Sequence, residues 1–194
     1  NNVLMKRRTD IGTNANRKDY VDLGLTSGTL WATMNVGATS ETDYGDYFMW
    51  GSTTPNTDTP CNWANTPFNN GLDSYNEEYF TTHKSEWLDS KDNLKPEFDA
   101  ARAIMGGDWR MPTEAEIQEL IDNTTNKWTP VNGVYGRKFT SKTDTSKYIF
   151  FPPSGYRFSS SFINQGERSY VWSSSLNTPY LGYAQNFCSS SISS

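Results

Sequence analysis

Few side chains in this 194-residue sequence are typical of catalysis, and their arrangement does not favour it. Acyl transfer requires a nucleophile, a base and a group that orients the base, yet His83 is the only histidine. Serine clusters at 159–161, 173–175 and 189–194, where small polar residues are typical of exposed strands and loops. The sequence therefore predicts no Ser-His-Asp triad, and we assign no catalytic residue.

Paired carboxylates are the second source of chemistry to consider. Glycoside hydrolysis needs two carboxylates that flank a sugar, and the nearest pairs are residues 77–78 and 114/116. The second pair has the position that a helix dipole favours at the start of a helix. Three aspartates offer oxygens for a cation cage, but their spacing is not that of a known calcium loop: Asp43, Asp46 and Asp58. We expect structural or solvated carboxylates here.

Cysteine and histidine give no spacing that is typical of metal ligands. Cys61 and Cys188 are the only cysteines. In an exported protein they can form one long-range disulfide, but the simpler expectation is two unpaired thiols. A soft-metal site would require the fold to bring the two thiols together, and His83 has no Cys or His at ligand spacing nearby. The sequence thus predicts no metal and no cofactor.

Composition and charge exclude other classes of function. The net charge of −5 argues against nucleic-acid binding, which needs a basic surface, and the only basic cluster is Lys6–Arg8. No run of about 18 apolar residues exists, so we expect no membrane span. Aromatic residues make up 14% of the chain, which predicts a core built from rings. The sequence begins Asn1-Asn2 rather than Met, so any signal peptide or lipid anchor would already have been removed, and the absence of a targeting segment is uninformative.

The clearest structural element is the stretch 106–122. Two glycines allow a tight bend, and Pro112 disfavours the helical conformation at the residue before it. Thr113 and Glu116 form a Thr-x-x-Glu capping box, so a helix is predicted to start there. Its apolar face is expected to consist of Ile117, Leu120 and Ile121.

A second helix is predicted over 95–105, upstream of the first. Proline suits its first turn, and its apolar stripe is Phe98, Ala101, Ile104 and Met105. The remaining patterns are β-type. We expect a hairpin from 19–25 and 29–37, another turn at Asn132-Gly133, and strands at 135–140, 148–151, 169–175 and 183–188. Between these regions lies a long polar insertion studded with aromatic residues, which is expected to be a packed loop.

Residues 109–116, Trp-Arg-Met-Pro-Thr-Glu-Ala-Glu, resemble a motif of bacterial C-type-lectin-like domains. Three groups share it: formylglycine-generating enzymes, variable proteins of diversity-generating retroelements, and the Fibrobacter-type major paralogous domain of Bacteroidetes surface proteins. Residues 20–38 and 43–51 are similar to the opening signature of the paralogous domain. Phe-Pro-Pro-Ser-Gly-Tyr-Arg at 151–157, Tyr-Val-Trp-Ser-Ser-Ser at 170–175 and Ala-Gln-Asn-Phe at 184–187 are similar to its close.

The resemblance implies an α+β, C-type-lectin-like fold, loop-rich, with two short helices packed on twisted antiparallel sheets. It places one domain at 19–194 with an insertion at about 52–90, after a linker or N-terminal extension at 1–18. The chain lacks the final strand that usually pairs with the first strand in this family. Either that strand is absent or another segment supplies it, such as the candidate strand Asn2–Lys6 or a neighbouring copy by strand exchange.

The resemblance also bears on function. Formylglycine-generating enzymes depend on two cysteines near the C-terminal end, where this chain has only Cys188. The calcium-site motifs of animal C-type lectins are absent. The last third is rich in Tyr, Ser and Asn, a composition typical of paratopes, and the retroelement variable proteins place their binding face there.

We therefore expect a non-enzymatic, adhesin-like ligand-binding domain, secreted or on the cell surface as an outer-membrane lipoprotein or pilus-associated protein. Its ligand would be a protein or carbohydrate, and the resemblance to retroelement variable proteins implies a sequence that a retroelement diversifies. A structural pilus- or lipoprotein-associated assembly domain and a formylglycine-generating-type oxidase are the alternatives. Tyr156 is expected to be buried, and Trp31, Trp109 and Trp172 are assigned to the core. The predicted contact residues are Phe158, Asn164, Arg168, Tyr170, Asn177, Tyr180 and Tyr183.

Overall fold

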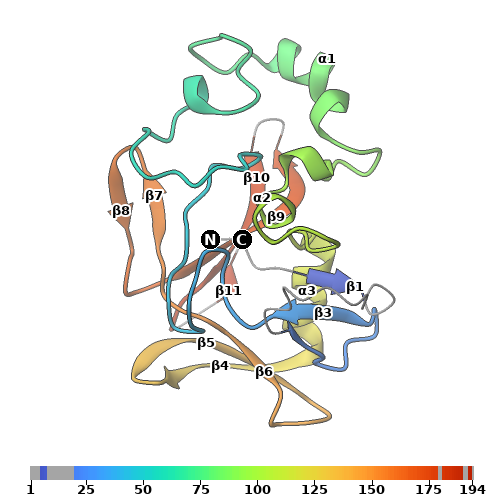
Figure 1. The fold of residues 1–194 in the computed structure, drawn as a ribbon, viewed down its shortest axis with the longest axis vertical. Helices are drawn as coiled ribbons and strands as arrows, with labels where there is room; N and C mark the ends of the chain where they lie inside the picture. Colours follow the sequence, from blue (N-terminus) through green and yellow to red (C-terminus); the bar gives the residue numbers. More distant parts are fainter. Residues whose placement is uncertain (1–4, 8–19, 179–180, 190–191, 194) are drawn as a thin grey trace.

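Three α-helices and several small antiparallel sheets, joined by long loops, make up the described part of the chain (Figure 1). The computed structural model describes residues 5–7, 20–178, 181–189 and 192–193. The α+β class and the loop-rich character are confirmed, but the described helices number three rather than two. In chain order the elements are β1 (Met5–Arg7), β2 (Tyr20–Val21), β3 (Thr29–Ala32), η2 (Trp63–Asn65), α1 (Glu77–Trp87), η3 (Pro96–Phe98), α2 (Ala100–Met105), α3 (Glu114–Asn123), β4 (Thr124–Val131), β5 (Val134–Ser141), β6 (Tyr148–Phe151), β7 (Tyr156–Phe158), β8 (Ser161–Ile163), β9 (Ser169–Thr178), β10 (Leu181–Phe187) and β11 (Ile192–Ser193).

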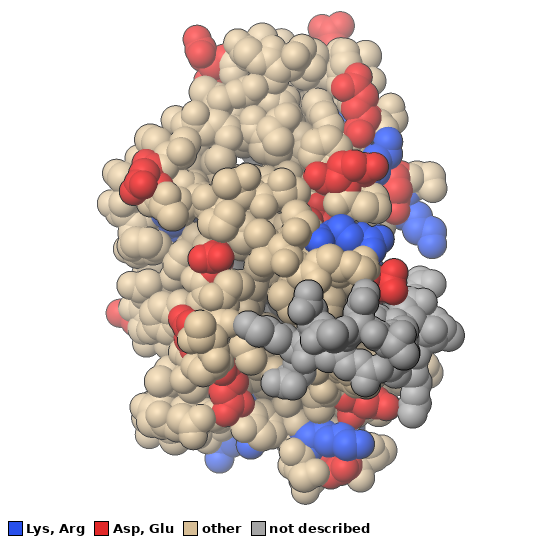
Figure 2. All heavy atoms as spheres, in the orientation of Figure 1, with Lys and Arg blue, Asp and Glu red and all other residues tan. Residues whose placement is uncertain are grey.

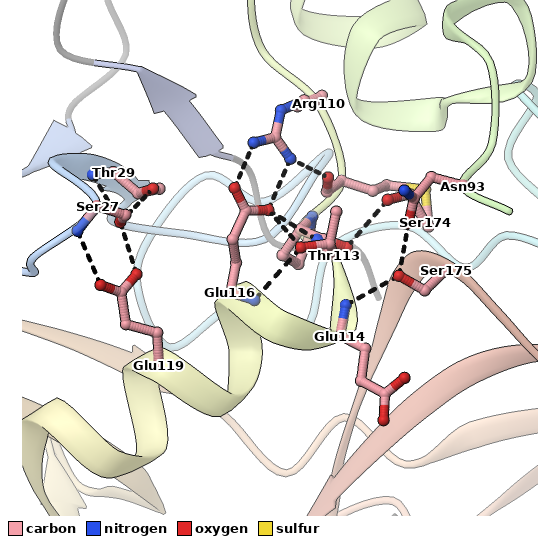
Figure 3. Close-up of polar contacts among 12 residues, drawn as sticks. Ser27, Thr29, Asn93, Arg110, Thr113, Glu114, Glu116, Glu119, Ser174 and Ser175 are labelled. Carbon is pink, nitrogen blue, oxygen red and sulfur yellow. Dashed lines mark hydrogen bonds and ion pairs between the residues drawn. The ribbon is translucent and has the colours of Figure 1, made fainter. Parts of the chain in front are cut away.

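Helix α3 begins with the predicted capping box. The Thr113 side chain accepts a hydrogen bond from the Glu116 backbone N–H, and the Glu116 carboxylate accepts one from the Thr113 backbone N–H at 2.9 Å. The same carboxylate forms an ion pair with Arg110, as Figure 3 shows. Because Arg110 also donates to the Met111 carbonyl, one side chain ties the turn to the helix. Arg110 therefore has a structural role at the start of α3.

Polar contacts in the first two turns of α3 attach this helix to distant parts of the chain (Figure 3). Near its start, the Glu114 backbone N–H donates to the Ser175 hydroxyl of β9 at 3.0 Å. One turn later, the Glu119 carboxylate accepts from the Ser27 backbone N–H and hydroxyl, in the turn between β2 and β3. The apolar face lies inward as predicted, with Ile117 and Leu120 buried. Helix α3 is therefore the element that joins the N-terminal hairpin to the C-terminal strands.

The Glu116 ion pair makes stability depend on pH. Burial alone would raise the pKa of Glu116, but the hydrogen bonds and charge of Arg110, together with the Thr113 donors, outweigh it and hold the pKa below its usual value. A lowered folded-state pKa contributes stability that is present above the unfolded pKa of about 4.3 and is lost as the pH falls through the folded value. Glu116→Gln is expected to lower the free energy of unfolding by about 1–3 kcal/mol at pH 7.

This deficit should shrink as the pH is lowered below about 4.3, because the wild-type carboxylate is then neutralised too. Urea titrations at pH 7, 5, 4 and 3 would measure it as the difference between wild type and variant at each pH. The matched control is Glu114→Gln, an exposed carboxylate one residue after the cap. A deficit that stayed constant with pH would contradict the ion-pair interpretation.

The sheet β4-β5-β6 forms one end of the molecule, at the bottom of Figure 1. Its first hairpin turns at Asn132-Gly133, where both residues have positive φ, 46° and 82°. This is the conformation that the right-handed twist of a two-residue hairpin requires, which is why Asn-Gly predicts it. Strands β5 and β6 agree with the predicted ranges to within two residues.

The N-terminal strands form a second sheet in the order β1-β3-β2. The predicted hairpin is present, but its strands are shorter than expected, at two and four residues. Strand β1 overlaps the candidate strand Asn2–Lys6. It pairs antiparallel with β3, with Met5 opposite Trp31 and Arg7 opposite Thr29. A closing strand would instead have paired with β2, the first strand of the predicted domain. The last strand, β11, pairs with β10. Residues 2–4 of the candidate strand lie outside the described residues.

The insertion after residue 51 is not the loop that the sequence analysis predicted, because it contains helix α1. Asn76 caps α1 by accepting from the Tyr79 backbone N–H at 2.8 Å. The helix buries only Phe80 and Trp87, which stand two turns apart and pack edge to face or tilted against neighbouring rings. The aromatic residues of the insertion therefore do pack, as expected, but they hold a helix in place.

The helix predicted over 95–105 is broken in the middle. A short 3-10 helix ends at Phe98, and Asp99 adopts extended backbone and caps the separate helix α2 by accepting from the Arg102 backbone N–H. The other Asp99 oxygen accepts from the Met111 backbone N–H at 2.8 Å. Burial raises the pKa of Asp99, against these backbone hydrogen bonds. Ile104, assigned to the apolar stripe, is 43% exposed, and the buried residues of α2 are Ala100 and Ala101.

Buried side chains form two clusters. One lies between α3 and strands β3, β5, β6, β9 and β10, and includes Trp31, Phe139 and Phe151. The other joins the insertion to α2 and the segment before it, and includes Phe68 and Trp87. Trp31 and Trp109 belong to these clusters as predicted. The candidate site described next lies beside the second cluster.

Candidate ligand-binding site

A cavity of about 260 Å³ opens where the β7–β8 hairpin meets the start of β9 and the segment 47–61. Figure 1 shows this hairpin standing at one side of the molecule, beneath the insertion. Five aromatic rings line the cavity: Tyr47, Phe48, Tyr156, Tyr170 and Trp172. A concave site walled by rings is the usual form of a small-molecule site.

Most polar ends of these rings are already engaged with the protein. The Tyr47 hydroxyl donates to the Ser154 carbonyl and accepts from Gln165 at 3.0 Å. The Trp172 indole N–H donates to the Phe48 carbonyl at 3.1 Å. Asn164 donates to the Tyr170 hydroxyl at 3.0 Å. What the rings offer to a ligand is therefore mainly their apolar faces.

The polar wall of the cavity is formed by Arg157, Asn56 and Cys61. One terminal nitrogen of Arg157 donates to the Asn56 carbonyl oxygen at 2.7 Å, and the Asn56 side chain donates to the Cys61 sulfur at 3.1 Å. Burial raises the pKa of the Cys61 thiol, against smaller opposing effects of Arg157 and Asn56. The thiol is thus neutral at physiological pH, and the guanidinium is the only charged group among the described residues that line the cavity.

A second chamber of about 300 Å³ continues from the first toward the insertion. Four residues line both chambers: Phe48, Cys61, Arg157 and Trp172. The second chamber adds rings of the insertion cluster, including Trp63, Phe68 and Tyr75. Arg157 therefore borders both chambers, and we refer to the two adjacent chambers together as the groove.

The β7–β8 hairpin depends on Gly155 at its base. Gly155 has φ of 63°, and a Cβ there would come within 2.3 Å of the Ile163 carbonyl oxygen. Its backbone N–H donates to the Arg168 carbonyl at 2.8 Å, which anchors the hairpin to the segment before β9. Glycine is required because the backbone of the returning strand fills the space of a side chain. This close approach sets the position of Tyr156 and Arg157 in the site.

The structure brings some of the predicted contact residues together and separates others. Tyr170 lines the cavity and packs against Tyr156, with ring centroids 4.8 Å apart, and Asn164 is its hydrogen-bond partner. Phe158 and Arg168 are exposed on or beside the same hairpin but outside the cavity wall. Asn177 is exposed near the other end of β9, roughly 20 Å along the strand from Tyr170. Tyr180 lies outside the described residues, as does the side chain of Tyr183.

Two burial predictions are wrong. Tyr156 is 37% exposed rather than buried, because it stands on a two-stranded hairpin that no other sheet covers. Trp172 is half-buried and lines both chambers, whereas the sequence analysis assigned it to the core.

The sequence analysis also missed the other wall of the site: Tyr47, Phe48, Asn56, Cys61, Trp63 and Arg157. The length and aromatic content of the insertion were the available signal, because long ordered loops are commonly functional.

Neither Cys61 nor Cys188 forms a disulfide. In the part of the chain that the structure describes, no group of three or more His, Cys, Asp or Glu side chains is arranged to hold a metal ion. The structure likewise contains, among those residues, no helix with the length and apolar character that a membrane crossing requires. On the face shown in Figure 2, acidic and basic side chains are scattered among uncharged residues.

Comparison of the chain with protein-family models, with curated proteins and with solved structures gives no match. Function is therefore argued from the site itself.

Proposed function

We propose that this protein is a non-enzymatic ligand-binding domain, with a C-type-lectin-like fold, that acts as an adhesin-like module at the cell surface. The observation that carries the proposal is the grouping of exposed rings beside a ring-lined groove. Of the five large apolar side chains exposed in the described part, three lie on the β7–β8 hairpin: Tyr156, Phe158 and Phe162. Exposed apolar groups that gather at one place are typical of interaction sites.

Two architectural features support the lectin-like part of the proposal. Helices α2 and α3 are joined by the segment that carries the Trp-Arg-Met-Pro-Thr motif, and α3 docks on antiparallel strands from both ends of the chain. The exposed hairpin follows the Phe-Pro-Pro-Ser-Gly-Tyr-Arg run, where the resemblance places the start of a binding face. The assembly-domain alternative predicts no concave site, so the groove favours the binding module. The oxidase alternative needs a thiol pair, and only one of the two cysteines lines the groove.

A binding assay on glycan and extracellular-protein arrays tests the proposal. The wild-type chain is expected to bind a defined subset of the arrayed ligands, and Phe158→Ala is expected to weaken that binding by about tenfold or more, since exposed aromatic residues are typical hot spots. Tyr135→Ala is the matched control, because Tyr135 is 59% exposed but stands on β5, away from the hairpin. Absence of binding on both arrays, or equal losses in the two variants, would overturn the proposal.

A further inference from the structure

The guanidinium of Arg157 has more donors than the protein uses. Its hydrogen bonds to described residues all come from one terminal nitrogen and go to Asn56. Its Nε–H is buried and has no partner, and no carboxylate of the described residues forms an ion pair with it. Buried polar groups are nearly always hydrogen-bonded, so an unpartnered donor in a groove needs an explanation.

A second residue that lines the groove also carries an N–H donor without a partner. The Trp63 indole N–H is buried and makes no hydrogen bond, and Trp63 lines the second chamber together with Arg157. Both unsatisfied groups are N–H donors, and one belongs to a cation. A ligand that satisfies them must present acceptor oxygens and negative charge, which a carboxylate does through two oxygens that match the planar fork of arginine.

The rest of the ligand is constrained by the ring faces. Most hydroxyl and indole groups of the first chamber already bond to the protein. A ligand covered in hydroxyls would therefore lose hydrogen bonds to water on binding and gain few hydrogen bonds to the protein. A flat apolar ring would instead pack on Tyr156, Tyr170 and Trp172, where ring pairs gain stability from edge and offset contacts. The first chamber, at about 260 Å³, lies just below the range of about 300–1,000 Å³ that is typical of drug-sized ligands, so it suits a single ring.

We infer that the groove binds an aromatic carboxylate, with the carboxylate on Arg157, which borders both chambers, and the aromatic ring in the first chamber. This inference rests on the proposed binding function and gives it a ligand chemistry. The overall charge of −5 does not oppose it strongly, because screening at physiological salt limits repulsion between charges beyond about 8 Å.

Titration calorimetry with 3-phenylpropanoate and its neutral analogue 3-phenylpropanamide tests the inference on the unaltered protein. The acid is expected to bind, and the amide about tenfold or more weaker, since a hydrogen bond to a charged group is at stake. Equal affinity of the acid and the amide, or no binding of either, would overturn the inference. Tighter binding of glucuronate than of 3-phenylpropanoate would overturn it in favour of a sugar-acid site.

Variants locate the carboxylate. Arg157→Gln is expected to reduce affinity for 3-phenylpropanoate about tenfold or more while leaving the weak amide binding unchanged. Arg102→Gln removes the same charge from a partly exposed position on α2, outside the groove, and should have no effect. Trp63→Phe keeps the ring and removes the N–H, so a smaller loss, of a few fold, is expected. Equal losses in the two arginine variants would contradict the assignment. If Arg157→Gln fails to fold, the comparison of acid and amide still decides.

A third experiment distinguishes whether the carboxylate belongs to a small free acid or to the C-terminus of a peptide. An N-acetylated peptide that ends in phenylalanine, with a free C-terminal carboxylate, is compared with the same peptide as its amide. Selective binding of the free-acid peptide, tighter than that of 3-phenylpropanoate, supports the inference and identifies a peptide C-terminus as the source. Selective binding of the small acid alone supports a free metabolite.

The two proposals fail separately. Binding on the arrays that depends on Phe158, with no preference for the acid over the amide, leaves the adhesin-like function standing and removes the ligand assignment. Binding of the acid through Arg157, with no binding on either array, leaves the ligand assignment standing and removes the adhesin-like function.

Discussion

Replacing Phe68 by alanine is expected to lower the free energy of unfolding by about 3–5 kcal/mol. Phe68 is 3% exposed and stands at the centre of the insertion cluster. Its ring centroid lies 4.9 Å from that of Trp87, 5.6 Å from that of Trp50 and 5.9 Å from that of Phe98. The ring thus connects helix α1, the segment before the insertion and the 3-10 helix before α2. Its removal leaves a cavity where these three meet.

Urea unfolding, followed by both tryptophan fluorescence and far-ultraviolet circular dichroism, would measure this loss. Phe158→Ala is the matched control, because it removes the same ring from a position that is 65% exposed and should change stability by about 0.5 kcal/mol or less. A loss below about 1 kcal/mol for Phe68→Ala would show that the insertion is not part of the cooperatively folded unit. Coincident transitions by the two probes would show that it is.

Local sequence signals predicted the elements whose caps and turns are formed by residues close together in the sequence. The capping box of α3 joins Thr113 to Glu116, three positions apart, and the β4–β5 turn needs only Asn132-Gly133. Both depend on backbone conformations that specific residue types favour over a few positions. The strand predicted after that turn, 135–140, agrees with β5, whereas strand β4 before the turn was not predicted.

Helix α1 was missed because its sequence has no clear apolar stripe at helical spacing. It contains two threonines, which have low helix propensity, and buries only Phe80 and Trp87. Its stability depends on rings that come from elsewhere in the chain, so tertiary packing outweighs local preference. The break at Asp99 has a similar origin, since the buried carboxylate bonds to the Met111 N–H twelve residues away.

The candidate site was predicted only from one side. The resemblance directed attention to the stretch after Tyr156, and Tyr170 and Asn164 do meet there. The opposite wall comes from residues about one hundred positions earlier: Arg157 bonds to Asn56, and Tyr47 packs on Phe162 at 4.9 Å. No local pattern encodes a pairing across such a separation. The burial of Tyr156 was misjudged for the same reason, because it depends on which strands cover the hairpin.

Replacing Phe151 by alanine is the other change with a large expected effect, again about 3–5 kcal/mol of unfolding free energy. Phe151 is 2% exposed on β6. Its ring centroid lies 5.2 Å from that of Phe187 on β10, 5.5 Å from that of Phe139 on β5 and 6.5 Å from that of Trp31 on β3. These strands belong to three different sheets, so this one ring packs all three sheets against each other.

The loss in Phe151→Ala should therefore be global rather than local. Hydrogen exchange of β3, β5 and β10 amides should accelerate together, by the factor that corresponds to the measured loss of stability. Phe151→Leu keeps most of the buried volume and should cost less than the alanine variant. Faster exchange confined to β6 would contradict the role given to this ring. Comparison with Phe68→Ala then shows whether the two ring clusters unfold together. If each variant accelerates exchange in the elements around both clusters, the clusters form a single cooperative unit. If each variant accelerates exchange only in the strands and helices around the mutated ring, they form two units.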